Sequence, residues 1–101
     1  MAKLFTTDGI EITVVPENGK NFTLKEMQMV VGGTIDILPT PSGTEEIVIN
    51  DNGKLDGLPE NVAASRWWQH QYPIAEFPIN NDGLIVGNCL IGTPQEFGGE
   101  E

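Results

Sequence analysis

The sequence contains one cysteine, one histidine and five basic residues in a total of 101. Cys89 has no second cysteine to pair with, so we expect a fold held by packing alone, in a reducing compartment such as the cytoplasm. With His70 as the only histidine, the chain has little from which to build a zinc cluster or a conventional catalytic triad. We therefore predict a protein that is not an enzyme and holds no metal or cofactor.

Basic residues are also outnumbered, five against fifteen acidic ones, which gives a net charge of −10. Contacts to a phosphate backbone need clustered lysine and arginine, so we expect no direct binding to nucleic acid. Two interpretations of the acidic surplus remain open. It keeps a small protein soluble, or it forms an acidic face that imitates phosphates and occupies a nucleic-acid-binding partner.

Long hydrophobic runs are missing as well. No apolar segment approaches the roughly 18–20 residues that cross a bilayer, and residues 1–15 lack the apolar stretch and cleavage site of a signal peptide. We expect no contact with a membrane. The hydrophobic fraction of 39% and the length of 101 residues support one compact domain with one core.

Four segments have the pattern of β-strands. Residues 9–15 and 34–38 alternate apolar and polar side chains, as half-buried strands do. A short loop with proline and glycine leads from 34–38 to 45–50, which predicts an antiparallel hairpin. Residues 84–92 are almost continuously apolar and predict a central strand, with Gly87 placed for a bulge.

Residues 23–32 carry the clearest helix signal. Thr23 and Glu26 have the spacing of a capping box, and Phe22 and Met27 that of a hydrophobic staple. Gly32 supplies the left-handed residue that ends many helices. This region therefore predicts a short amphipathic helix.

Residues 59–71 predict a second helix. Its apolar side is expected to contain Val62, Ala63 and Trp67. Trp68 is about 100° further round the helix. We therefore expect Trp68 to lie nearer the solvent-exposed rim.

The elements follow the order β-α-β-β-α-β, which predicts a single small α+β domain at residues 1–93. About four strands would form a mostly antiparallel sheet, with two short helices packed on it. Residues 94–101 are expected to form a flexible acidic tail. An exposed sheet edge can pair two copies of the chain, so a homodimer is one open alternative.

The stretch at residues 50–61, NDNGKLDGLPEN, resembles a ligand loop at first sight. An EF-hand is excluded, because Val48 and Pro59 would stand at the first and last ligand positions, which need side-chain oxygens. A phosphate loop is excluded too, since no serine or threonine follows the lysine. The stretch instead predicts a strand-to-helix connection in which Gly53 and Gly57 take positive φ.

Binding is better supported than catalysis. The region around the second helix combines aromatic and hydrogen-bonding side chains of the types that dominate interface hot spots and stack on planar ligands. The adjoining polar loop adds a lysine and two amides. The candidate binding residues are Arg66, Trp68, His70, Tyr72, Lys54, Asn50 and Asn61. The structural alternative is that the two indoles fill the core and that Arg66 pairs with a nearby acid.

Three ordered stretches, LKEMQMVVGGTIDIL, VINDNGKLDGLPEN and GLIVGNCLIG, resemble the family of small proteins called domain of unknown function 3846. The residues that match the family pattern are Gln28, Val31, Gly32, Gly33, Ile35, Asn50, Gly53, Lys54, Leu55, Leu58, Pro59, Asn61, Gly87 and Gly92. The sequence departs from this pattern in an insert at residues 67–81. The resemblance implies an accessory protein of phages, plasmids or other mobile elements, without an assigned enzymatic activity.

These observations lead to two expectations for function. The first is a non-enzymatic, acidic anti-defence or accessory protein that binds a host protein, with nucleic-acid mimicry as one mode. The alternative is a protein that binds or sequesters a nucleotide-like small molecule between Trp68 and the polar loop. A structural subunit without a ligand remains a third.

Overall fold

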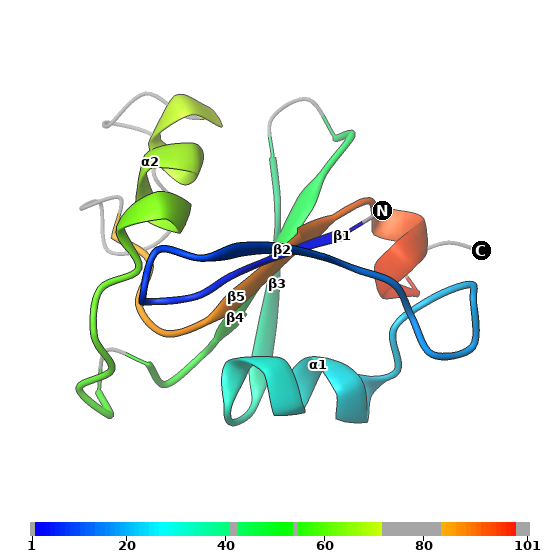
Figure 1. The fold of residues 1–101 in the computed structure, drawn as a ribbon, viewed down its shortest axis with the longest axis horizontal. Helices are drawn as coiled ribbons and strands as arrows, with labels where there is room; N and C mark the ends of the chain where they lie inside the picture. The colour runs from blue at the N-terminus through cyan, green and yellow to red at the C-terminus, as the bar shows by residue number, and fades with distance from the viewer. Residues whose placement is uncertain (1, 41–42, 54, 72–83, 99–101) are drawn as a thin grey trace.

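The computed structural model describes residues 2–40, 43–53, 55–71 and 84–98. Its elements are β1 (Ala2–Phe5), β2 (Glu11–Val14), α1 (Leu24–Val31), β3 (Ile35–Pro39), β4 (Glu46–Asn50), α2 (Val62–Gln71), β5 (Cys89–Gly92) and a 3-10 helix η2 (Pro94–Phe97). The strands form one antiparallel sheet in the order β2-β1-β5-β4-β3 (Figure 1). The α+β class is confirmed, with five strands where about four were predicted. The additional strand is β1.

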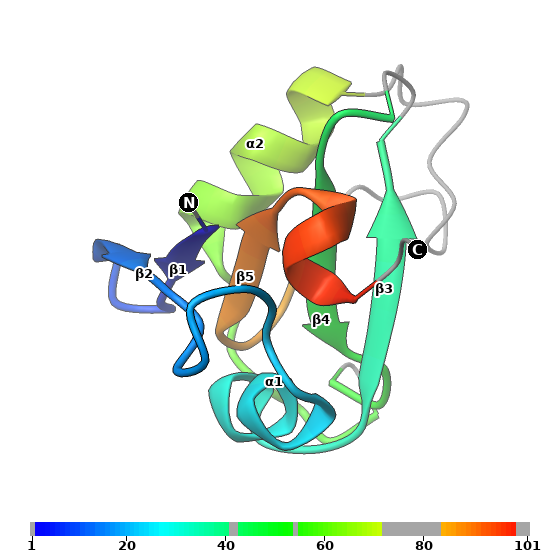
Figure 2. The same cartoon turned by 90° about the vertical axis from the view of Figure 1, so that its right-hand side faces the viewer.

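Helices cover both faces of this sheet. Successive side chains along a strand point to opposite faces, so the strands contribute to a hydrophobic cluster on each face. In β4, Ile47 and Ile49 belong to one hydrophobic cluster and Val48 to the other. The first cluster includes Trp68 of α2, and the second includes Met27 of α1. Figures 1 and 2 show α1 and α2 on opposite sides of the strands.

Helix α1 forms as predicted from its caps. The Thr23 hydroxyl accepts a hydrogen bond from the Glu26 amide at 3.1 Å, and the Thr23 amide donates to Glu26 Oε1 at 2.7 Å. This hydrogen bond from Thr23, with a second from the Glu17 amide, lowers the pKa of the Glu26 carboxyl. Gly32 ends the helix with φ 79°. Met27 is buried in the core, and Met29 is exposed.

Residues 94–97 form a folded element, although they were predicted to belong to a flexible tail. The predicted tail begins with η2, which has its own capping box from Thr93 and Glu96. Phe97 is buried, and its ring centroid lies 6.1 Å from that of Phe22 at the start of α1. Phe97 therefore anchors residues 94–97 on the α1 side of the sheet.

The last strand is shorter than predicted. Only Cys89–Gly92 belongs to β5, while Val86 makes an isolated bridge to Glu60. Gly87 interrupts the run with φ 76°, and a Cβ at this position would lie 2.8 Å from Leu58 Cδ1.

Among the described residues, no helix has both the length and the apolar character needed to cross a membrane.

Candidate functional site

Helix α2 turns a different side toward the sheet than predicted. Its buried residues are Ala64, Ser65 and Trp68, and Asn61 just before the helix is buried too. These four positions follow the i, i+3, i+4, i+7 spacing of one helix face. The prediction that Trp68 lies near the rim is wrong, because its side chain is 0% exposed. Val62, predicted on the apolar side, is 51% exposed.

The buried polar residues of α2 explain this orientation. Asn61 Nδ2 donates to the carbonyl oxygens of Phe5 at 2.8 Å and Gly87 at 2.9 Å, and Asn61 Oδ1 accepts from the Ala64 amide at 3.1 Å. The Ser65 hydroxyl bonds both the amide and the carbonyl of Ile85. These bonds satisfy the buried polar groups and attach α2 to the segment leading into β5.

The opposite side of α2 faces solvent and contains two of the predicted binding residues. Arg66 and His70 are exposed and lie one turn apart, in line with Val62. Trp67 lies beside them, half-buried, with its ring centroid 6.5 Å from that of Trp68. We call Val62, Arg66, Trp67 and His70 the outer face of α2. Tyr72 lies outside the described residues.

The loop after β4 uses its predicted binding residues internally. Asn50 is buried, its Nδ2 donates to the Val31 carbonyl at 3.2 Å, and its Oδ1 accepts from the Asn52 amide at 2.8 Å. Asn50 and Asn61 therefore connect distant parts of the backbone. Lys54 lies outside the described residues. No group of three or more metal-ligating side chains occurs in the described part of the chain.

The two glycines of this loop have different roles. Gly57 takes a positive φ of 71°, as predicted. Gly53 is not among the positive-φ glycines, so that part of the prediction is wrong. A Cβ at Gly53 would lie 2.8 Å from Val86 Cγ2, which means that close packing, not backbone conformation, requires glycine there.

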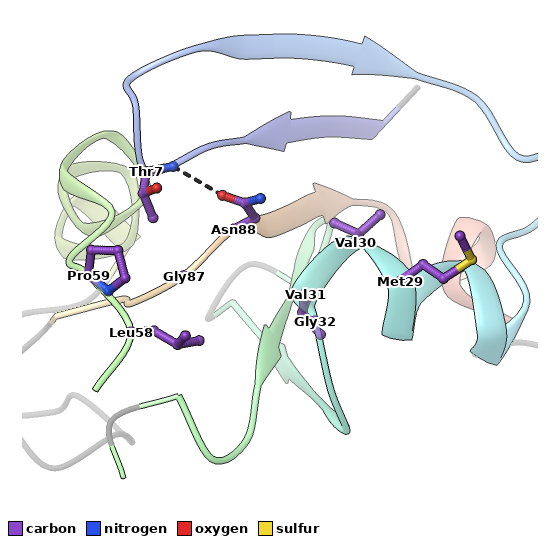
Figure 3. A pocket seen from close by; sticks show the side chains of 9 residues that line it. All are labelled: Thr7, Met29, Val30, Val31, Gly32, Leu58, Pro59, Gly87 and Asn88. Atoms are coloured by element: carbon purple, nitrogen blue, oxygen red, sulfur yellow. Dashed lines mark hydrogen bonds between the residues drawn. The ribbon is translucent and has the colours of Figure 1, made fainter. Parts of the chain in front are cut away.

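An open pocket of about 260 Å³, which no sequence pattern predicted, lies beside this loop (Figure 3). Its wall combines the C-terminal end of α1, the end of the loop, the residues before β5 and the turn after β1. The lining residues are Thr7, Met29, Val30, Val31, Gly32, Leu58, Pro59, Gly87 and Asn88. The Thr7 amide donates to Asn88 Oδ1 at 3.1 Å across one side. None of these nine lining residues is ionisable, so the pocket suits an uncharged group.

The pocket is formed where the three stretches that carry the family resemblance meet. Val31 and Gly32 come from the first stretch, Leu58 and Pro59 from the second, and Gly87 from the third. No local pattern in the sequence locates the pocket, because the three stretches come together only in the fold.

Cys89, the single thiol, lies in the core with no exposed surface. Burial raises its pKa to about 12. The thiol is therefore neutral near pH 7 and packs as a small apolar side chain. This arrangement does not suit a nucleophile.

The model of one protein family, described as Domain of unknown function (DUF3846), matches residues 6–98. No curated protein and no solved structure matches the chain. The matched range begins directly after β1 and includes α1, α2, all the pocket residues and η2. The chain therefore belongs to the DUF3846 family.

Proposed function

We propose that this protein is a non-enzymatic binding protein of a phage or other mobile element, and that it occupies a host protein in the cytoplasm. The observation that carries the proposal is the outer face of α2. It presents Arg66 and His70 to solvent beside the half-buried Trp67, in a chain with a net charge of −10. Arginine and tryptophan are the residue types most enriched at interface hot spots.

The acidic surface supplies the second part of the proposal. Asp8, Glu11, Asp36, Asp56 and Glu60 are among the exposed acids. A surface with this charge accelerates encounter with a basic partner, while the outer face of α2 supplies the anchor that holds the complex. A nucleic-acid-binding defence factor is the host protein whose basic surface best complements such a chain, and inhibition by mimicry is the corresponding mode of action.

The outer face of α2 is tested by replacing Arg66 and His70 with alanine together. Because both side chains are exposed, we expect the unfolding free energy to change by no more than about 0.5 kcal/mol. The affinity for a host protein captured with the wild-type chain should fall by about tenfold or more, as expected for loss of a hot-spot arginine. Isothermal titration with the purified partner measures this change.

The matched control replaces Lys20 and Lys25, two exposed cations outside α2, with alanine. It should leave the affinity nearly unchanged. The wild-type complex should also weaken steeply as salt concentration rises. Equal losses in both double variants, or an affinity that does not respond to salt, would contradict the proposal.

A second candidate function is supported by the pocket. A nucleotide-like ligand cannot stack on Trp68, because that side chain is 0% exposed. We infer that a small ligand would instead enter the pocket of about 260 Å³, with an uncharged, partly apolar group against Val30 and Leu58. Ligand pockets of this kind combine apolar walls with few polar groups, and Asn88 supplies an amide here. The charged part of a nucleotide would remain in solvent.

Thermal denaturation with a panel of nucleosides and nucleotides tests the pocket. A ligand present at 100 times its Kd should stabilise the chain by about 2.7 kcal/mol, which raises Tm by roughly 10 °C or more in a domain of this size. Met29→Arg adds bulk and charge at the pocket and should abolish the shift, since Met29 lines it and is exposed. Leu24→Arg, exposed on the same helix, should keep it. The absence of any shift across the panel would count against this candidate.

A further inference from the structure

The sheet has two open edges, formed by β2 and β3. Within the described residues β2 pairs only with β1, and β3 only with β4. Figure 2 shows β2 as the outermost strand beyond β1. An edge strand offers backbone groups that another chain can bond, unless the protein protects them.

The hydrogen-bond register identifies the groups that β2 presents. The Thr6 amide donates to the Ile10 carbonyl at 2.9 Å, so this pair is a hydrogen-bonded one. Bonded and non-bonded pairs alternate along an antiparallel ladder. Ile12, opposite Leu4, is therefore bonded to β1, whereas Glu11 and Thr13 direct their amides and carbonyls away from it. The outer edge of β2 thus presents two donors and two acceptors.

The edge of β3 is better protected against pairing with another strand than the edge of β2. The Thr40 amide donates to the Glu45 carbonyl, and alternation from this pair directs Ile35, Ile37 and Pro39 outward. Proline has no N–H, and proteins commonly place it on an edge to prevent further pairing. No proline lies within Glu11–Val14. The edge of β2 is therefore the more receptive of the two.

The two faces of β2 define the side chains that an added strand must have. Ile10 and Ile12 are 51% and 43% exposed, and Ile12 lies on the α1 side of the sheet, because its register partner Leu4 packs there. Helix α1 makes its main contacts with β3, β4 and β5, and Ile10 and Ile12 at this end of the sheet stay exposed. Glu11 lies on the other side with Phe5, and its Oε2 is 2.8 Å from Lys3 Nζ. The added strand would therefore need apolar residues on one face and basic or hydroxyl residues on the other.

We propose that β2 binds an extended segment of a partner protein as a sixth, antiparallel strand with alternating apolar and basic side chains. This inference rests on the proposed function in that the ligand is a polypeptide. Main-chain bonds to Glu11 and Thr13 would provide affinity, and contact with Ile12 would provide selectivity. The exposed acids Asp8 and Glu11 in this hairpin and Glu17 just after it complement a basic segment.

A second copy of the chain is a poorer occupant of this edge. Each copy has a net charge of −10, so two copies repel each other. A pair of four-residue strands also buries much less than the roughly 1,200 Å² of a stable interface. Charge therefore favours a basic segment from another protein over a second copy of this chain.

The test uses the full-length chain and a blocked eight-residue peptide of alternating valine and lysine, followed by amide NMR and hydrogen exchange. The peptide should slow exchange of the Glu11 and Thr13 amides. An acidic peptide of alternating valine and glutamate should not bind. The valine–lysine peptide with its backbone N-methylated on the bonding edge keeps its charge and side chains, so its affinity should fall by about tenfold or more.

A protein variant provides an independent test. Thr13→Pro removes an amide that β1 does not use, so peptide affinity should fall by about tenfold. Ile12→Lys keeps the backbone edge but replaces the apolar contact with the valine side chains of the peptide by a charge, and it should weaken binding as well. If Thr13→Pro fails to fold, the N-methylated peptide on the wild-type chain still decides the question. Equal binding of the methylated peptide overturns the proposal.

The remaining outcomes separate this inference from the proposed function. Concentration-dependent protection of Glu11 and Thr13 without peptide would show a homodimer edge and overturn the inference. If capture of a host protein depends on Arg66 and His70 but not on Thr13, the proposed function stands and the β2 inference falls. If the peptide protects β2 while no host protein is captured, the inference stands and the proposed function falls.

Discussion

Replacing Trp68 with alanine is expected to lower the unfolding free energy by about 3–5 kcal/mol, the range measured for large aromatic residues in protein cores. The side chain is 0% exposed and packs in a cluster with Ile47, Ile85 and Cys89. Small domains have a total stability of about 5–15 kcal/mol, so the variant should lose a large part of its stability. Urea denaturation followed by circular dichroism measures the loss.

Trp67→Ala is the matched control, because it removes the same side chain from the neighbouring position. Trp67 is only half-buried, so its removal should cost clearly less than that of Trp68. A larger loss for Trp67 would show that α2 is rotated and would remove the basis for its outer face. Trp67→Phe leaves Trp68 as the only tryptophan, and its fluorescence should then be blue-shifted and poorly quenched by iodide.

The elements that could be predicted from the sequence depend on short-range signals. Thr23, Glu26 and Gly32 set the ends of α1 through bonds within one or two turns, so their spacing was sufficient. The β3–β4 hairpin follows from two alternating segments joined by a short loop. Each of these signals acts over a few residues, and the α+β class followed from their order.

The orientation of α2 could not be predicted in this way. Two of its buried positions are polar, Asn61 and Ser65, and a search for an apolar stripe passes over them. Their polarity is satisfied by groups far away in the sequence, since Asn61 and Phe5 are 56 residues apart. Strand β1 was missed for a related reason: it has four residues, and its pairing with β5 is visible only in the fold.

The candidate site was predicted only in part. Arg66 and His70 lie on an exposed face as a binding role requires, whereas Trp68 is inside and Asn50 and Asn61 hold the backbone. The pocket and the open edge of β2 arise from contacts between distant segments, which no local pattern specifies.

The two proposed protein-binding surfaces are compatible with one partner. Glu11 shares a face of the sheet with Phe5, and Phe5 belongs to the cluster that contains Trp68 of α2. The basic side chains of a strand added to β2 would therefore lie on the side of the sheet that α2 covers. A partner with a basic extended segment next to an acidic or aromatic patch could contact both β2 and the outer face of α2.

Replacing Asn61 with alanine is expected to cost about 3 kcal/mol, although the residue was predicted to bind a ligand. About 1 kcal/mol is the share of a lost helix N-cap, because Asn61 Oδ1 accepts from the Ala64 amide. The rest comes from the two hydrogen bonds that Asn61 Nδ2 donates to the carbonyls of Phe5 and Gly87, at about 1 kcal/mol for each lost bond. Urea denaturation at neutral pH measures the sum.

Two further variants separate these contributions. Asn61→Ser restores a good N-cap acceptor but not the two amide bonds, so it should recover about 1 kcal/mol of the loss. Asn52→Ala removes an exposed amide from the same loop and should change stability by no more than about 0.5 kcal/mol. If Asn61→Ala is as mild as Asn52→Ala, the amide is not structural and its predicted binding role regains support. A large loss that Asn61→Ser partly reverses assigns Asn61 to the attachment of α2 and leaves recognition to the exposed side of that helix.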